Sequence, residues 1–219
     1  MLKPLLALTL ISISAQAKTL VITDSHGTGA FGGELAKLLE KKQQQVVDFY
    51  AFGGTKPIDW IEGNNLTWGY WEHHTGKMNK RGDNTPTPKL LDLISTHLPD
   101  TVIIEQGTNM VWHEQNDADR ENIQFLITAV KGSGAKCIWV GPPDLNIVNN
   151  PQANLNVEQN HLLLQQVTKS MGCQLIESWS FTHYPEGKGD GIHYDQISRI
   201  GSKLAKKWAQ DVFSRIKYE

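Results

Sequence analysis

The sequence has no concentration of charge. Its 219 residues include 21 lysines and arginines and 23 aspartates and glutamates, for a formal net charge of −2. Proteins that bind nucleic acid usually present a concentrated basic face. The basic residues near the C-terminus, Lys203, Lys206 and Lys207, fit the solvated face of a final helix instead. We therefore expect no nucleic-acid partner.

Long hydrophobic runs are also missing. The N-terminal run from Leu5 to Ile13 is too short for a membrane span of roughly 20 residues. It follows Lys3 and precedes Ala15-Gln16-Ala17, a small-x-small cleavage site, so residues 1–17 match a secretory signal peptide. An uncleaved anchor or a buried first helix is the alternative. We expect cleavage after Ala17, a periplasmic or secreted protein, and no stable membrane insertion afterwards.

Cysteine is scarce, with only Cys137 and Cys173 in the chain. Export would permit a disulfide between them. Both residues also begin apolar runs typical of strands, where buried free thiols are equally expected. The sequence leaves this pairing open.

No metal-binding motif stands out. The H-E-x-x-H signature is absent, and the adjacent histidines His73 and His74 are poorly arranged to ligate one ion in regular structure. A metal-dependent deacetylase using these residues or His26 is therefore a weak alternative. We expect neither a metal nor a cofactor.

One glycine motif suggests a different class of protein. Gly27-Thr-Gly29-Ala-Phe-Gly32 fits the dinucleotide-binding pattern G-x-G-x-x-G, with Asp48 near the distance of a ribose-binding acid. However, three residues separate the preceding strand from Gly27, and Asp48 is predicted inside a strand rather than at its end. We interpret the small residues as permitting close packing of the first helix on the sheet.

Apolar runs alternate with segments of helical period along residues 18–219. This alternation predicts one three-layer α/β/α domain with a five-stranded parallel sheet, whose active residues lie beyond the carboxyl ends of the strands. An aromatic-rich insertion at about 55–88 has no clear period. The predicted strands are 19–23, 46–50, 101–106, 136–141 and 174–177; the predicted helices are 33–42, 89–97, 119–131, 157–171 and 195–216, the last capped by Asp195.

Polar residues follow several of these strands. Ser25 comes directly after the first strand, in a turn that leads into a helix, and Asp190-Gly-Ile-His193 precedes the last helix. An Asp three residues before a His can orient its imidazole toward a serine hydroxyl. Gly53-Gly54 and Gly107-Thr-Asn109 follow the second and third strands and could supply donors to an oxyanion. Each pattern alone is also an ordinary turn or cap, but the doubly wound fold would gather all four at one crevice.

In these blocks the chain resembles the SGNH hydrolases, also called GDSL esterases and lipases, which have a flavodoxin-like fold. Thr23-Asp24-Ser25, Gly54, Gly107-Thr108-Asn109 and Asp190-Gly-Ile-His193 match the family's blocks in order, with Gly53 as the alternative to Gly54. Thr23 stands where the family usually has Gly, and Met110 where Asp is common. The resemblance implies that Ser25 is the nucleophile, His193 its base and Asp190 the residue orienting His193. It also implies an oxyanion hole formed by Ser25, Gly54 and Asn109.

The insertion and its surroundings suggest the substrate. Aromatic faces beside polar groups suit the rings of sugars, although the tryptophans could equally anchor a long loop. We expect an exported serine esterase that removes acetyl groups from a carbohydrate of the cell envelope, such as peptidoglycan. The alternatives are a lipase- or thioesterase-like acyl hydrolase and a carbohydrate-binding protein without activity. The expected substrate-binding residues are His26, Trp60, Trp68, Trp71, His74 and Trp112.

Overall fold

The computed structural model describes residues 16–63, 65–77, 79–147 and 150–217. Most of the expected signal peptide, residues 1–15, lies outside these ranges. Within them, no helix combines the length and the apolar character that crossing a membrane requires.

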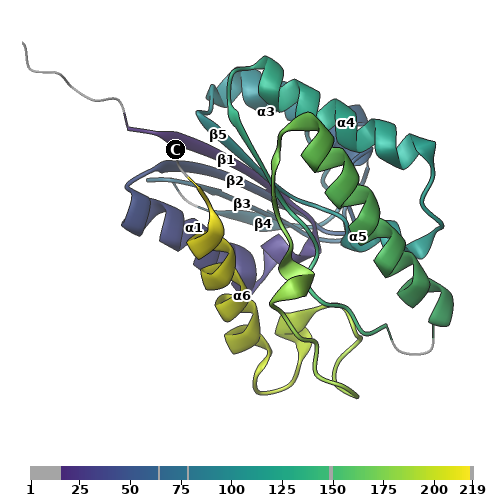
Figure 1. Ribbon diagram of the computed structural model, residues 1–219. Helices are drawn as coiled ribbons and strands as arrows, with labels where there is room; N and C mark the ends of the chain where they lie inside the picture. The colour runs from purple at the N-terminus through teal and green to yellow at the C-terminus, as the bar shows by residue number, and fades with distance from the viewer. Residues whose placement is uncertain (1–15, 64, 78, 148–149, 218–219) are drawn as a thin grey trace, which may run out of the picture.

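A seven-stranded sheet forms the centre of the molecule, in the order β4-β3-β2-β1-β5-β6-β7 (Figure 1). The expected α/β fold is confirmed, but the expected number of five strands is wrong. Five strands are parallel, and the two additional ones, β3 and β4, are antiparallel. The strands are β1 (Lys18–Thr23), β2 (Val46–Phe52), β3 (Tyr70–His74), β4 (Lys80–Gly82), β5 (Thr101–Glu105), β6 (Lys136–Val140) and β7 (Gln174–Ile176).

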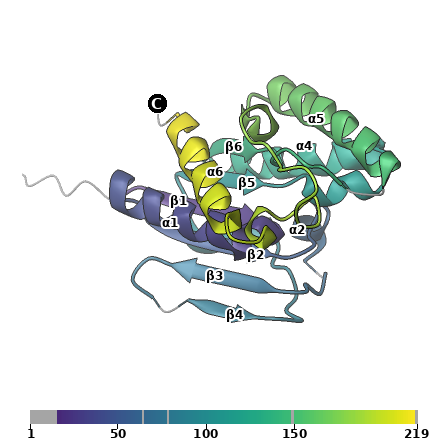
Figure 2. The ribbon, with the colours of Figure 1, turned by 90° about the horizontal axis from the view of Figure 1, so that it is seen from below.

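The additional strands come from the aromatic-rich stretch after β2. This stretch folds back as a hairpin, and β3 pairs with β2 so that Tyr70 lies opposite Phe52. Figure 2 shows β3 and β4 at one edge of the sheet, beyond β2. The sequence of β3, Tyr-Trp-Glu-His-His, does not alternate between apolar and polar residues, so it gave no period-two signal.

Helices cover both faces of the sheet (Figure 1). Alternate residues of β1 point to opposite layers, because side chains alternate along a strand. Leu20 and Ile22 pack in the layer of α3, α4 and α5, and Val21 packs in that of α1 and α6. The helices are α1 (Ala30–Gln43), α2 (Asp59–Glu62), α3 (Leu90–His97), α4 (Asp117–Gly132), α5 (Pro151–Met171) and α6 (Gly201–Arg215), with 3-10 turns η1 (Ser25–Thr28), η2 (Thr108–Trp112), η3 (Ser178–Ser180) and η4 (Tyr194–Gln196).

The glycines around the start of α1 serve close packing, as expected. A Cβ atom at Gly27 would lie 1.6 Å from Thr23 Oγ1, and one at Gly32 would lie 2.0 Å from the Gly27 carbonyl oxygen. Asp48 lies inside β2, where His74 and His97 contact its carboxylate, rather than at the end of the strand. Both observations agree with the packing interpretation of the glycine motif.

The last helix begins later than expected. Asp195 lies in η4 rather than at a helix N-terminus, and α6 starts only at Gly201. Arg199 has a positive φ of 67°, which interrupts helical geometry. A Cβ atom on Gly201 would lie 2.2 Å from the Tyr194 carbonyl oxygen, so the helix packs closely on η4. The expected cap at Asp195 is therefore wrong.

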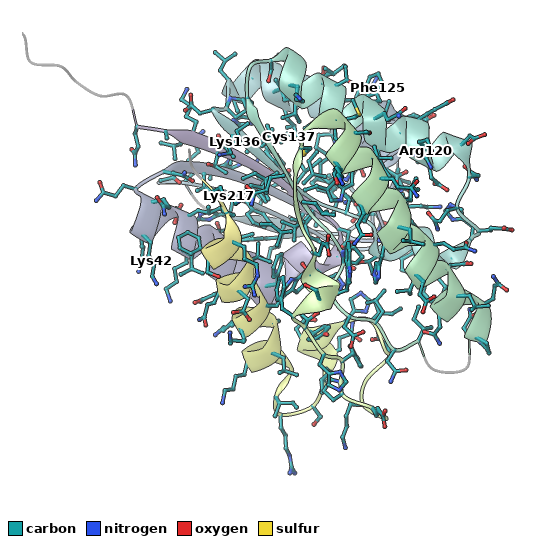
Figure 3. All side chains as sticks on the ribbon, viewed as in Figure 1. Lys42, Arg120, Phe125, Lys136, Cys137 and Lys217 are labelled. Atoms are coloured by element: carbon teal, nitrogen blue, oxygen red, sulfur yellow. A yellow bond between two sulfur atoms is a disulfide. The ribbon has the colours of Figure 1, made fainter. Side chains whose placement is uncertain are left out.

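Cys137 and Cys173 form a disulfide. Figure 3 labels Cys137 beside Lys136, at the start of β6, and Cys173 directly precedes β7. The bond therefore joins the amino-terminal ends of two parallel strands. The sequence had left this pairing open.

Candidate active site

Ser25, His193 and Asp190 lie in one hydrogen-bonded chain. Ser25 Oγ is 3.0 Å from His193 Nε2, and His193 Nδ1 is 2.6 Å from Asp190 Oδ2. Ser25 opens the 3-10 turn directly after β1, whereas His193 and Asp190 come from the loop before α6. The fold thus brings together residues 168 positions apart. A hydroxyl, an imidazole and a carboxylate in this order can generate a strong nucleophile.

The loop geometry holds Asp190 in position. Its Oδ1 accepts hydrogen bonds from the backbone amides of Ile192 at 2.9 Å and His193 at 2.8 Å. Gly191 between them has φ of 82°, and a Cβ atom there would lie 2.0 Å from the Asn146 carbonyl oxygen. Burial raises the pKa of Asp190, but the hydrogen bonds from His193 and Ile192 outweigh it, so the pKa lies below its usual value. Asp190 is therefore ionised at neutral pH.

Gly54 and Asn109 lie at the same sheet edge, after β2 and β5. Gly53 donates its amide to the Gly69 carbonyl at 2.8 Å, so its N–H is already used, which favours Gly54 as a donor to a ligand. Gly54 has a positive φ of 79° and open space around its Cα. Asn109 Nδ2 donates to the Thr55 carbonyl at 3.0 Å. A carboxamide has a second N–H, which could meet a ligand oxygen.

A buried set of hydrogen bonds supports these groups from below. Thr55 Oγ1 accepts hydrogen bonds from Gln106 Nε2 at 3.1 Å and Trp60 Nε1 at 3.3 Å, and it donates to the Phe52 carbonyl. Thr55 therefore ties the segment that contains Gly54 to the end of β5 and to α2. Sequence reasoning missed Thr55 and Gln106. Their positions directly after Gly54 and directly before Gly107 were the available signal.

A cleft of about 630 Å³ opens above these groups. Ser25, His193, Gly54 and Asn109 all line it. Two exposed tryptophans also line it: Trp68 is 91% exposed and Trp112 is 50% exposed. The lining also includes the positively charged side chain of Lys56. Within the described ranges, no Asp or Glu side chain lines the cleft.

Comparison with known proteins rests on structure alone. No protein-family model and no curated protein sequence matches the chain. Among solved structures, a catalytic mutant of Axe2, an acetylxylan esterase from Geobacillus stearothermophilus, matches with a TM-score of 0.61 at 15% identity, covering 94% of this chain and 97% of that one. The native aryl esterase of M. smegmatis matches with a TM-score of 0.60 at 18% identity, covering 91% and 100%. A lipase/acylhydrolase from Enterococcus faecalis matches with a TM-score of 0.57 at 16% identity, covering 93% of this chain and 99% of that one.

The chain has the SGNH hydrolase fold. The matches span nearly the whole length of each matched chain, so the similarity concerns the complete fold rather than a shared substructure. The blocks that carried the resemblance in the sequence, around Ser25, Gly54, Asn109 and His193, line a single cleft of this SGNH hydrolase fold.

Four of the six expected substrate-binding residues lie in the interior of the fold instead. Trp60 is fully buried, and Trp71 is 3% exposed, with its ring stacked on His73 and tilted against Phe49. His74 Nδ1 lies 2.7 Å from Asp48 Oδ1, and the His74 ring stacks on that of His97 in α3. These three expectations are wrong because the insertion extends the sheet edge, and its side chains join the core on the two faces of the sheet. Trp68 and Trp112 do line the cleft.

His26 is the fourth of these residues. It is only 4% exposed, and its ring packs edge-on against Trp208 at 5.1 Å and lies 5.6 Å from the ring of His193. Burial, and then the nearby charge of His193, lowers the pKa of His26 to about 3. The ring is therefore neutral at physiological pH and lies behind His193, where it cannot contact substrate.

The histidines of the insertion are engaged with carboxylates. His73 Nε2 lies 2.7 Å from Glu40 Oε1, and His74 pairs with Asp48. In the described part of the chain, no group of three or more His, Cys, Asp or Glu side chains is arranged to hold a metal ion.

Proposed function

We propose that the protein is a carboxylic ester hydrolase with Ser25 as nucleophile, His193 as general base and Asp190 as the residue that orients His193. The observation that carries this proposal is the Ser25–His193–Asp190 chain, which opens into a cleft large enough for a small ester. The esterases and acylhydrolases among the fold's relatives support the same class of reaction.

In the first half-reaction, Ser25 Oγ attacks the ester carbonyl carbon while His193 Nε2 takes the hydroxyl proton. The oxygen of the tetrahedral intermediate would accept hydrogen bonds from the Ser25 and Gly54 amides and the Asn109 side chain. His193 then gives its proton to the departing alcohol, which leaves an acyl-serine. In the second half, His193 Nε2 takes a proton from a water molecule as its oxygen attacks the acyl carbon. His193 then returns that proton to Ser25 Oγ as the bond between Oγ and the acyl carbon breaks, which releases the free acid.

The substrate that we propose is an acetylated carbohydrate of the cell envelope. Trp68 and Trp112 line the cleft near Ser25, and their exposed indole faces can stack on the C–H faces of sugar rings. Two acetylxylan esterases are among the fold's relatives. The presence of Lys56, with no carboxylate in the described lining, also suits an envelope polymer that carries negative charge, such as peptidoglycan.

We further propose that the protein is exported after removal of residues 1–17. The disulfide between Cys137 and Cys173 supports this, because disulfides persist in oxidising compartments and are rare in the cytosol. N-terminal sequencing of the extracytoplasmic protein should begin at Lys18. An intact Met1 on the exported protein would contradict the cleavage.

The chemistry is tested by acetate release from an aryl acetate, with wild type, Ser25→Ala and His193→Ala measured side by side. We expect both variants to lose about 10⁶-fold in kcat, which would bring them to background, because nucleophile and base act as one unit. Ser178→Ala is a control, since Ser178 is a buried serine in η3. A Ser25→Ala variant that keeps its rate would refute the assignment.

The substrate class needs a separate comparison. Acetylated oligosaccharides, O-acetylated peptidoglycan fragments and esters of long fatty acids should be compared by kcat/KM. We expect the acetylated sugars to be preferred. A clear preference for long acyl chains would contradict the carbohydrate proposal without affecting the assignment of Ser25.

A further inference from the structure

Two acidic side chains lie directly behind the Ser25 turn, and the mechanism above uses neither. Asp24 precedes Ser25, Glu105 ends β5, and both are 0% exposed. Their strands run side by side, with Thr23 of β1 as the register partner of Glu105. Carboxyl groups are almost never fully buried unless they are paired. This pair therefore requires a physical explanation.

The hydrogen bonds around the pair leave one oxygen of each group without a donor. Asp24 Oδ1 accepts the His26 amide at 3.0 Å, and Glu105 Oε2 accepts the Asp24 amide at 3.4 Å. Asp24 Oδ2 and Glu105 Oε1 are buried and lack a hydrogen-bond partner within the described part of the chain. Two ionised carboxylates only accept hydrogen bonds, so they cannot satisfy each other. A single proton between them makes one carboxyl group a donor to the other.

The electrostatics indicate which group holds the proton. Burial raises the pKa of Glu105 well above its usual range, and the neighbouring Asp24 charge raises it further. Burial also raises the pKa of Asp24, but only to about 6, because the His26 amide opposes the effect. At neutral pH these shifts place the proton on Glu105 and leave Asp24 ionised.

Few other groups act on this pair. The Thr108 hydroxyl in η2 lowers the pKa of Asp24 by hydrogen bonding, and His193 lowers it by its charge. His193 is itself paired with Asp190, and the ring of His26 is neutral. Val140 of β6, the register partner of Glu105, and Ala51 of β2, the register partner of Thr23, carry no charge.

We propose that Asp24 and Glu105 share one proton and that this pair positions the turn that carries Ser25. Glu105 is then a positioning residue for the ester hydrolysis proposed above, on which this inference rests. The Asp24 carboxylate accepts a hydrogen bond from the His26 amide, and the Asp24 amide donates one to the Glu105 carboxyl group. The pair therefore fixes the backbone on both sides of Ser25. That backbone sets the direction of the Ser25 amide and hydroxyl. Loss of the shared proton places two negative charges in contact, and their repulsion would displace the turn.

The test compares Glu105→Gln with Glu105→Ala. A glutamine N–H can donate to the Asp24 carboxylate at every pH, whereas alanine leaves that carboxylate buried and unpaired. With an aryl acetate at pH 7, we expect Glu105→Gln to keep kcat within about threefold of wild type. Glu105→Ala should lose about ten- to a hundredfold in kcat, with a smaller change in KM, because misplacing a reacting group by about 1 Å has an effect of that size.

The pH profile separates positioning from simple structural support. Wild-type kcat should fall at alkaline pH, as the pair loses its proton, and Glu105→Gln should lack this fall. If Glu105→Gln loses as much kcat as Glu105→Ala at pH 7, or keeps the wild-type alkaline fall, the shared proton is refuted. Full kcat in Glu105→Ala would refute the positioning role.

A second readout does not depend on activity. Glutamate has a pKa of about 4.3 in an unfolded chain, and Glu105 binds its proton more tightly in the folded state. The contribution of Glu105 to folding stability should therefore be greatest below that pH and decline as pH rises through the folded pKa. Chemical denaturation of Ser25→Ala, with and without Glu105→Gln, should show a smaller decline when Glu105 is replaced. Parallel pH profiles would refute proton sharing, whereas an active Ser25→Ala would refute only the proposed function.

Discussion

The cleft has a floor, formed by Ser25, Gly54 and Asn109, and a rim, formed by Trp68, Trp112 and Lys56. The two differ in how their side chains are held. Ser25, Gly54 and Asn109 of the floor follow parallel strands. Thr55, next to Gly54, accepts hydrogen bonds from the side chains of Gln106 and Asn109. The rim consists of more exposed side chains: Trp68, in the loop before β3, is 91% exposed, and Trp112, at the end of η2, is 50% exposed. Groups on rigid elements can be positioned accurately enough for chemistry, whereas exposed loop residues can adapt to different ligands. We therefore expect floor substitutions to change kcat and rim substitutions to change KM.

Asp190→Asn should give the largest effect among substitutions of supporting residues. An amide at this position favours the wrong tautomer of His193, and the corresponding change in a buried triad lowers kcat about 10⁴-fold. Since Asp190 is partly exposed, about 10³-fold is expected on an aryl acetate. The control is Asp119→Asn, because Asp119 contacts His113 at 3.0 Å outside the cleft. Equal losses in both variants would contradict the special role of Asp190.

Asn109→Ala should follow, with a loss of about 10²- to 10³-fold in kcat and little change in KM, as expected for one oxyanion donor. Steady-state kinetics on an aryl acetate would measure both parameters. Asn65→Ala serves as the control because Asn65 is another asparagine that lines the same cleft. A rise in KM at constant kcat would mean that Asn109 binds the substrate without stabilising the oxyanion, and would contradict the difference between floor and rim.

Trp68→Ala and Trp112→Ala should each raise KM for acetylated oligosaccharides about tenfold, in line with the loss of one stacked ring. The same variants should hydrolyse an aryl acetate with nearly unchanged kcat. Phe125→Ala is the control, because Phe125 is an aromatic residue of α4 that is 44% exposed (Figure 3). If KM for oligosaccharides stays constant in both tryptophan variants, the rim does not bind sugar.

Lys56→Met should have the smallest effect. An exposed ion pair contributes at most about 1 kcal/mol, so KM for an anionic acetylated sugar should rise up to about fivefold and KM for a neutral one should stay constant. Added salt should reduce the difference in wild type. Lys77→Met is the control, as Lys77 is exposed in the turn after β3. Equal effects on neutral and anionic sugars would exclude a charge-based preference.

The same contrast explains what the sequence could predict. The floor could be found because its residues follow apolar runs, and strands of this composition end at one edge of a parallel sheet. The rim could be found only in part. Trp68 and Trp112 line the cleft as expected, but Trp60 and Trp71 do not, because nothing local in a segment without period distinguishes a tryptophan that packs from one that faces solvent. The hairpin of β3 and β4 decides this through its pairing with β2.

The roles of the residues beneath the floor, Glu105 and Gln106, could not be predicted from the sequence either. Glu105 and Gln106 end an apolar run and were expected only as part of a strand. Their contacts with Asp24 and Thr55 depend on the register between β1, β2 and β5, which local periodicity does not encode. The late start of α6 has a similar cause, since Gly201 is needed by a tertiary contact with Tyr194.

The exposure of Trp68 has an optical consequence. An indole in water emits at longer wavelength than a buried one, and a dissolved quencher such as iodide reaches it by collision. Trp60, Trp71, Trp139 and Trp208 are at most 3% exposed, so they lie beyond such a quencher. A ligand that covers Trp68 would shift the emission to the blue and protect it from iodide. Fluorescence could thus report occupancy of the cleft in a protein whose Ser25 has been removed.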